Sequence, residues 1–194
     1  MKNRRSMVLY ATLGVLAIAL IATVAVLSRN PETVPQSATD APSIAPLKVG
    51  EQAPDFSVST TDGPFSLSEA QKKPVLLEVF ATWCPHCQRE TRVLNNLFDA
   101  YSGRFNLVAV SGSANGRNGT EPESQADVVR FAQDFSVRYP VAFDPDLTVA
   151  HQYLQGGFPT VVLIGKDRTI RSINSGEVPY ATLRADLEKA LKEN

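Results

Sequence analysis

The chain has 194 residues, of which 43% are hydrophobic and 20% are charged, and its formal net charge is −1. This composition is typical of a globular protein and excludes extensive disorder, while the near-zero net charge gives no basis for nucleic-acid binding. Two cysteines are too few for a disulfide scaffold.

An uncharged apolar run covers residues 7–27, directly after the basic opening MKNRRS. A helix of this length rises about 30 Å, the thickness of the hydrocarbon core of a bilayer. Lys2, Arg4 and Arg5 predict that the N-terminus stays in the cytoplasm while the rest of the chain crosses. A cleaved signal peptide is the alternative, but its apolar region is shorter and ends in small residues of the A-x-A type. We expect residues 1–28 to be an uncleaved, single-pass transmembrane anchor.

Residues 29–49 are rich in Pro, Ser, Thr and Ala and show no apolar period, which predicts a flexible linker. The folded domain is therefore expected over residues 50–194. The predicted orientation puts this domain on the extracytoplasmic, periplasmic side of a bacterial cytoplasmic membrane, where stable disulfides form.

The rest of the chain alternates between strand and helix patterns. Such alternation favours an α/β sheet with helices on both faces. In chain order, the expected elements are a hairpin turning at Asp62-Gly63, a buried strand over 74–82, a helix over 84–101, a buried strand over 105–112, a loop over 113–123, a helix over 124–136, an extended segment over 139–145, a short helix over 146–155, a hairpin of 160–164 with 169–173, and a final helix with Leu183, Leu187, Ala190 and Leu191 on its apolar face.

Both cysteines lie in the motif WCPHC, residues 83–87, which allows three interpretations. A structural disulfide is disfavoured, because so small a loop constrains the unfolded chain little. A structural zinc site needs four ligands. Only His86 and His151 are available beside the cysteines, and His86 is poorly placed between them. We therefore expect a redox couple, with no metal and no cofactor other than the disulfide itself.

The position of the motif assigns different roles to its residues. Cys84 is expected in the first turn of a helix, where free N–H groups and the helix dipole favour a thiolate. Pro85 suits that turn because it has no N–H group, and a protonated His86 would add positive charge beside the sulfur. Cys87 lies one turn later, within disulfide reach. Cys84 is thus expected to be the exposed nucleophile and Cys87 the resolving thiol.

Three residues give the motif its context. Glu78, within the apolar run VLLEVF, has a predicted raised pKa, and it is either part of an ion pair at a sheet edge or a proton acceptor for Cys87. Pro159 precedes the apolar run TVVLI, which favours a special turn, with a cis peptide as one option. Trp83 fits the core or a docking surface equally well.

With these residues, the domain resembles the thioredoxin superfamily, and most of all the TlpA/ResA group of membrane-anchored, extracytoplasmic thiol-disulfide oxidoreductases. The resemblance covers about residues 48–192 and rests on VGEQAPDF, LLEVFATWCPHC and GFPTVVLIGKDRTI. It implies a thioredoxin-like α/β fold, with a central mixed sheet, flanking helices and an N-terminal β-hairpin extension.

The resemblance also implies roles for individual residues. Pro159 is expected to be a cis-proline packed against the disulfide, and Phe158 to offer backbone groups to an extended client segment. The expected catalytic residues are Cys84, Cys87, Glu78 and Pro159. The expected client-binding residues are Trp83, Pro85, His86 and Phe158.

The dipeptide Pro85-His86 departs from the usual reductases of this group and resembles the oxidase DsbA. A histidine there stabilises the reduced form and makes the disulfide more oxidising; roughly 150 mV separates thioredoxin from DsbA. The chain lacks, however, the long helical insertion of DsbA-type proteins. We expect disulfide exchange with client proteins, with the reductase direction slightly favoured and cytochrome c maturation as a candidate process, and DsbA-like oxidation as the alternative.

By the same resemblance, the expected partners are clients with thiols or disulfides, and either a membrane thiol-disulfide carrier of the DsbD/CcdA kind or an oxidising quinone-linked protein. A thiol peroxidase is disfavoured. The APDF opening also occurs in peroxiredoxins, but those enzymes place Thr or Ser three residues before the reactive cysteine, where this chain has Ala81. A binding module without redox chemistry is disfavoured by the intact Cys84, Cys87, Glu78 and Pro159.

Overall fold

The structure is a computed structural model that describes residues 46–70 and 72–193. The predicted anchor over residues 1–28, and the linker up to residue 45, lie outside the described residues. Within the described ranges, no helix has both the length and the apolarity needed to cross a membrane. All of the described residues belong to one compact unit, Ile44–Asn194.

Strands and helices alternate along the chain as the apolar pattern predicted, and their observed ends differ from the predicted ends by a few residues. The strands are β1 (Ser57–Thr60), β2 (Gly63–Ser66), β3 (Val75–Phe80), β4 (Asn106–Ser111), β5 (Val141–Phe143), β6 (Thr160–Ile164) and β7 (Ile170–Ser175). The helices are α2 (Pro85–Ala100), α3 (Gln125–Asp134), α4 (Thr148–Tyr153) and α5 (Tyr180–Lys192).

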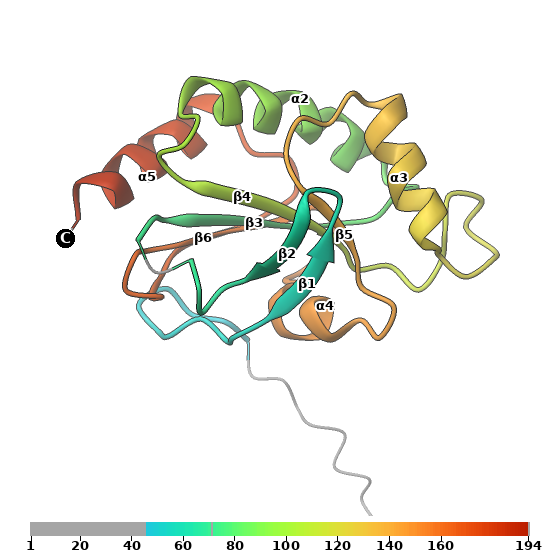
Figure 1. The fold of residues 1–194 in the computed structure, drawn as a ribbon, viewed down its shortest axis with the longest axis horizontal. Coiled ribbons are helices and arrows are strands. Elements are labelled where there is room, and N and C mark those ends of the chain that lie inside the picture. The colour runs from blue at the N-terminus through green and yellow to red at the C-terminus, as the bar shows by residue number, and fades with distance from the viewer. Residues whose placement is uncertain (1–45, 71, 194) are drawn as a thin grey trace, which may run out of the picture. The chain divides into compact units, whose positions relative to one another are not determined.

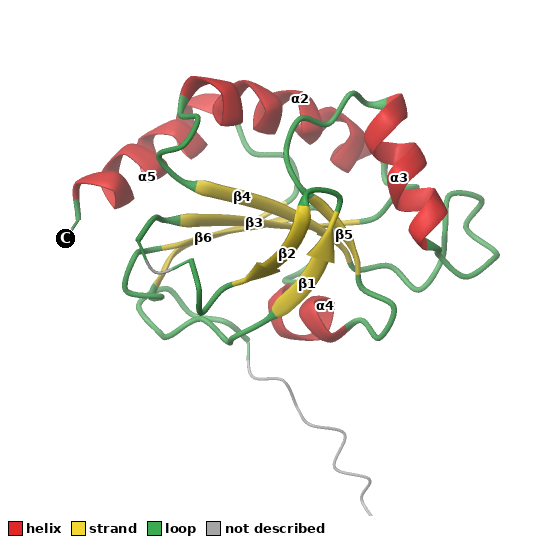
Figure 2. Ribbon diagram, viewed as in Figure 1, coloured by secondary structure: helices red, strands yellow, loops and turns green. Residues whose placement is uncertain are grey.

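One mixed sheet joins the strands in the order β2-β1-β5-β4-β3-β6-β7 (Figure 1). Strands β3, β4 and β5 are parallel and are connected through α2 and α3, whereas β6 and β7 add to β3 as an antiparallel pair. The predicted N-terminal hairpin is β1 with β2 (Figure 2). It turns where Gly63 takes a φ of 114°, a value that glycine adopts without strain. The pairing of Thr60 with Ala142 makes the hairpin a continuation of the main sheet.

Helices cover both faces of the sheet: α2, α3 and α5 lie on one face and α4 on the other (Figure 1). The alternation along β3 divides its side chains between the two faces. Leu76 and Phe80 pack in the cluster formed with α2, α3 and α5, and Leu77 and Val79 pack in the cluster formed with α4. A fully buried leucine contributes roughly 2 kcal/mol, so a one-residue slip of β3 would be costly. Glu78, two residues from both Leu76 and Phe80, therefore points towards α2.

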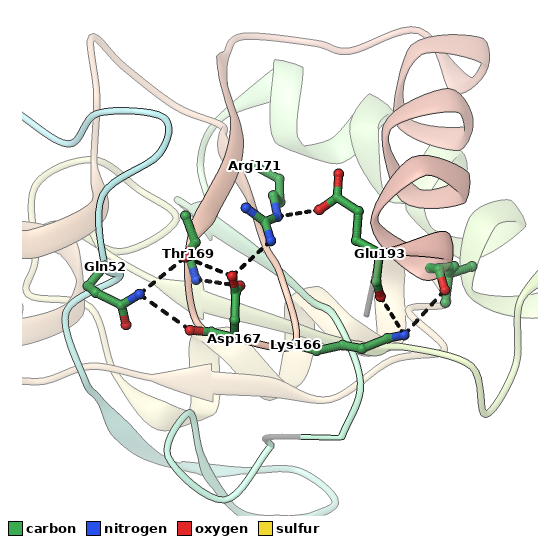
Figure 3. A network of polar contacts seen from close by, with 7 residues as sticks. Gln52, Lys166, Asp167, Thr169, Arg171 and Glu193 are labelled. Carbon is green, nitrogen blue, oxygen red and sulfur yellow. Dashed lines mark hydrogen bonds and ion pairs between the residues drawn. The ribbon is translucent and has the colours of Figure 1, made fainter.

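A polar network fixes the C-terminal end of the chain to the β6–β7 turn (Figure 3). Lys166 Nζ donates to the carbonyl oxygens of Leu191, at 3.3 Å, and Glu193, at 2.8 Å. These carbonyls have no partner within α5, so the lysine supplies one. Arg171 bridges the carboxylates of Glu193, at 2.7 Å, and Asp167, at 2.9 Å. The network therefore ties the C-terminal end of α5 to the β6–β7 turn.

Candidate active site

The motif WCPHC lies where β3 ends and α2 begins. Cys84 is the N-cap residue of α2, with an extended backbone (φ −78°, ψ 116°), and Pro85 is the first helical residue. We expected Cys84 in the first turn of the helix. In the structure it lies just before that turn. Its side chain makes no capping hydrogen bond. The sulfur nevertheless lies at the positive end of the helix dipole, where a thiolate is favoured.

The loop before β6 meets Cys84 from the other side. The peptide between Phe158 and Pro159 is cis, as anticipated. Cys84 Sγ donates to the carbonyl oxygen of Phe158 at 3.7 Å. Thr160 holds this loop, because its Oγ1 donates to the Gly157 carbonyl at 2.8 Å. Only 3% of Cys84 is exposed, so the nucleophile is less accessible than the sequence suggested.

Trp83 lies at the surface of the domain, which favours the docking interpretation over the core. Of its surface, 41% is exposed. Its indole Nε1 donates to Ser113 Oγ at 2.8 Å, and its ring meets that of Phe158 edge to face, with centroids 5.9 Å apart. The two aromatic rings therefore form an apolar surface beside Cys84.

Cys87 is fully buried in the face of α2 that packs on the sheet. Burial raises the pKa of the Cys87 thiol, and the neighbouring carboxylate of Glu78 raises it further. The thiol is therefore neutral at rest, and it needs a proton acceptor before it can attack a disulfide.

Glu78 is 2% exposed and belongs to β3, which pairs with β4 on one side and β6 on the other. It does not lie at a sheet edge, so the ion-pair interpretation does not hold. Tyr139 donates its hydroxyl to Oε2 at 3.4 Å, while Oε1 has no partner among the described residues. Burial, and secondarily the charge of Glu90, raises the pKa of Glu78 well above its usual range.

Glu90 is a second buried carboxylate, which the sequence reasoning missed. It follows Cys87 by three residues, on the same face of α2. Its Oε2 accepts from the Val178 N–H at 3.0 Å, and its Oε1 has no partner among the described residues. Burial raises the pKa of Glu90 to about 7. The spacing of Cys87, Glu90 and Leu94 was the signal in the sequence that could have revealed it.

A charged cluster surrounds the residue between the cysteines. His86 Nδ1 lies 2.6 Å from Glu177 Oε1, and Arg89 donates to the same oxygen from Nε at 3.0 Å and from Nη2 at 2.6 Å. Arg89, and then His86, lowers the pKa of Glu177 to about 2. The sequence placed the charge of His86 beside the sulfur; the structure also gives the imidazole a carboxylate partner. Glu177 is 91 residues away in the chain, so no local pattern reveals it.

The loop between β4 and α3 is tied to the residues just before the motif. Glu123 is buried, and its Oε1 accepts from Thr82 Oγ1 at 2.6 Å. Its other oxygen accepts from Ser111 Oγ at the end of β4. Trp83 also donates to Ser113 in this loop. These three bonds link the loop to Thr82 and Trp83, which directly precede Cys84, and to the end of β4.

Comparison with known proteins agrees with this geometry. Residues 49–173 match the AhpC/TSA family. The thiol-disulfide oxidoreductase ResA of Geobacillus thermodenitrificans is 31% identical over 144 residues, which cover 73% of this chain and 78% of that protein. The thioredoxin-like protein YneN of Bacillus subtilis is 30% identical, with 73% and 80% covered.

Solved structures give the same result. The crystal structure of a Chlorobium tepidum protein, described as a thiol:disulfide interchange protein DsbE, has a TM-score of 0.66 at 27% identity. The match covers 75% of this chain and 99% of that one. The chain therefore belongs to the AhpC/TSA family, as an enzyme of the thioredoxin-like thiol-disulfide oxidoreductase class.

Proposed function

We propose that Cys84 and Cys87 are the redox couple of this enzyme and that it exchanges disulfides with client proteins. One observation carries the proposal. Cys84 is the N-cap of α2, while Cys87 is buried one turn later beside two carboxylates with raised pKa values, Glu78 and Glu90. The arrangement supports a thiolate nucleophile at one position and a thiol that needs a base at the other.

In the first step, the Cys84 thiolate attacks one sulfur of a client disulfide. A bond forms between Cys84 and that sulfur, and the client disulfide breaks. The second client sulfur leaves as a thiolate and takes a proton from water. The product is a mixed disulfide, with no net change yet in the number of disulfide bonds.

In the second step, Cys87 loses its proton and attacks the sulfur of Cys84. Glu78 in its ionised form is the proposed acceptor, since its carboxylate neighbours the thiol and its Oε1 has no other partner among the described residues; the proton moves from the Cys87 sulfur to this carboxylate. Glu90 is the second candidate acceptor in the same face of the core. The mixed disulfide breaks, the client leaves with two thiols, and the Cys84–Cys87 disulfide takes the two oxidising equivalents.

Client docking is proposed at the surface formed by Trp83, Pro85, His86 and Phe158. Two exposed or half-buried aromatic rings provide apolar area beside the nucleophile. We propose that the backbone of Phe158 pairs with an extended client segment and that Pro159 fixes this loop against Cys84.

We propose the reductase direction, with the domain tethered to the extracytoplasmic side of the membrane through residues 1–28. The resemblance to the TlpA/ResA group, whose usual members are reductases, supports this direction, whereas His86 favours DsbA-like oxidation, the second candidate. A membrane thiol-disulfide carrier would re-reduce the couple, and a disulfide-bonded apo-cytochrome c is one candidate client. A potential near the thioredoxin value of about −270 mV supports reduction, and one near about −120 mV supports oxidation.

The test of the proposed couple replaces each cysteine separately. We expect Cys84→Ser to abolish reduction of a disulfide-bonded client such as insulin. Cys87→Ser is expected to complete only the first step and to accumulate a mixed disulfide, visible as a gel band that dithiothreitol removes. A client without cysteines is the control. Disulfide exchange by Cys84→Ser would contradict the assignment.

A further inference from the structure

Glu177 brings a carboxylate against the dipeptide that separates the two cysteines. Its Oε1 lies within 2.6 Å of both His86 Nδ1 and Arg89 Nη2, and it also accepts from Arg89 Nε at 3.0 Å. A single oxygen atom thus contacts both the imidazole of His86 and the guanidinium of Arg89 in the first turns of α2. The carboxylate of Glu177 and, to a smaller extent, a charge on the Cys84 sulfur raise the pKa of the Arg89 guanidinium, so Arg89 lies within electrostatic reach of the sulfur.

The segment that carries Glu177 is held on both sides by residues of the site. The Gly176 N–H donates to the Pro159 carbonyl at 2.8 Å. The Val178 N–H donates to Glu90 Oε2 at 3.0 Å, and the Val178 side chain is buried in the core. The carboxylate is therefore fixed against α2 by the fold, and its ion pairs do not depend on a freely moving loop.

We propose that Glu177 is a positioning residue that sets the reduction potential of the Cys84–Cys87 couple by neutralising the charge of His86 and Arg89. The inference rests on the proposed redox role of the two cysteines. The reduced couple carries a thiolate at Cys84 and the oxidised couple does not, so nearby positive charge stabilises the reduced form and makes the disulfide more oxidising. Glu177 opposes this effect and so makes the Cys84–Cys87 disulfide less oxidising.

The sign of the effect follows from counting charges. With Arg89 and Glu177 both ionised, the net charge of the cluster equals the protonated fraction of His86. Without the carboxylate, Arg89 alone keeps the net charge at or above one unit. Without Arg89, the net charge is zero or negative. The two changes therefore act in opposite directions, whatever the protonation of His86.

The size of the effect is modest, because the side chains of His86, Arg89 and Glu177 are 60%, 47% and 39% exposed and water screens their charges. We expect Glu177→Gln to shift the equilibrium with glutathione towards the reduced couple by about threefold to tenfold; tenfold corresponds to about 30 mV. Arg89→Gln is expected to shift the equilibrium towards the disulfide.

The experiment equilibrates the full-length protein, in detergent, with glutathione buffers of graded redox ratio and then traps free thiols with a maleimide that changes gel mobility. The two cysteines are the only ones in the chain, so the band reports this couple alone. Glu188→Gln is the matched control. It also removes a carboxylate that is paired with an arginine, Arg184, but it acts near Tyr101, beyond the far end of α2. Each variant is measured at low ionic strength and in 1 M salt, where charge effects shrink.

Opposite shifts for Glu177→Gln and Arg89→Gln, both reduced by salt and absent in Glu188→Gln, would support the inference. No shift for Glu177→Gln, a shift towards the disulfide, or shifts of the same sign in both variants would overturn it. A wild-type protein whose thiols do not equilibrate with glutathione would instead refute the proposed redox couple, so the two failures are distinguishable.

Discussion

At the scale of single residues, the site contains ionisable groups that the fold keeps out of water. Glu78 and Glu90 are both buried beside Cys87, and each has one oxygen without a partner among the described residues. A buried carboxylate is stable only in its neutral form unless it is well hydrogen-bonded. The two groups therefore lower the stability of the protein wherever they ionise, and buried groups with raised pKa values are typical of sites of proton transfer.

Glu90 makes this cost measurable. Its pKa of about 7 in the folded chain lies above the ordinary value of about 4.3, so the folded state binds more protons than the unfolded state between these two values. The stability that the group contributes is complete below the ordinary value and is lost as the pH rises through about 7. We expect Glu90→Gln, which keeps an acceptor for the Val178 N–H, to reduce the loss of unfolding free energy between pH 4.5 and pH 8 by about 3 kcal/mol.

Urea unfolding at the two pH values tests this expectation. Glu69→Gln makes the same change on an exposed side chain and serves as the control. If Glu90→Gln loses as much stability as the wild-type protein over this interval, the carboxylate does not ionise at a cost, and its place beside Cys87 has no energetic consequence.

At the scale of elements, the connection between β4 and α3 forms hydrogen bonds with the residues that directly precede Cys84. Glu123 accepts hydrogen bonds from Thr82, two residues after β3, and from Ser111, the last residue of β4. Ser113, in the same connection, accepts from the indole of Trp83. The residues directly before Cys84 are thus held by a segment that follows in the chain by about 30 to 40 residues.

Truncation of Glu123 should loosen this support. Glu123→Ala leaves two buried hydroxyl groups without their acceptor, and each lost buried hydrogen bond costs about 1 kcal/mol or more. We expect an unfolding free energy about 2–3 kcal/mol lower than that of the wild type, and slower client reduction because Trp83 is less well positioned. Glu123→Gln keeps an acceptor and should lose less than half as much. An alanine variant as stable as the wild type would contradict this account.

At the scale of the whole molecule, the sequence predicted the elements better than their arrangement. Strands and helices follow from local apolar patterns, such as the continuous run of β3 and the helical spacing of α2. The position of β1 beside β5 depends on pairing between distant segments, which no local pattern encodes. The cis peptide before Pro159 was one option left open by a proline preceding a buried strand, and the resemblance to the thioredoxin superfamily implied it.

The same division applies to the site. Cys84, Cys87, Glu78 and Pro159 could be selected from the sequence, because each is an unusual residue in its local context. The structure brings all four to one end of the sheet. Glu177 could not be selected, since an exposed glutamate in a connection carries no local signal and acquires meaning only from its contact with α2. The effect proposed for Glu177 on the reduction potential therefore depends on the complete fold and cannot be predicted from a local sequence pattern.

The last prediction concerns the attachment of this domain. We propose that residues 7–27 span the membrane, since the run is uncharged and long enough to cross the hydrocarbon core. Arginine at the centre of such a helix costs about 3 kcal/mol, so Leu16→Arg combined with Ile18→Arg should reduce insertion by roughly 6 kcal/mol. We expect the wild-type chain to remain in the membrane fraction after alkaline carbonate extraction, and the double variant to be released or retained inside the cytoplasm.

Alanine at both positions is the matched control for a change of side chain without charge: Leu16→Ala with Ile18→Ala should stay in the membrane. Orientation is tested in the same cells with a maleimide that does not cross the inner membrane, after mild reduction of the couple. Labelling of Cys84 in the wild-type protein, and its loss in the arginine variant, would support an extracytoplasmic domain. Release of the wild-type chain by carbonate would show that the run is not an anchor, and the domain would then have to meet its clients as a free protein.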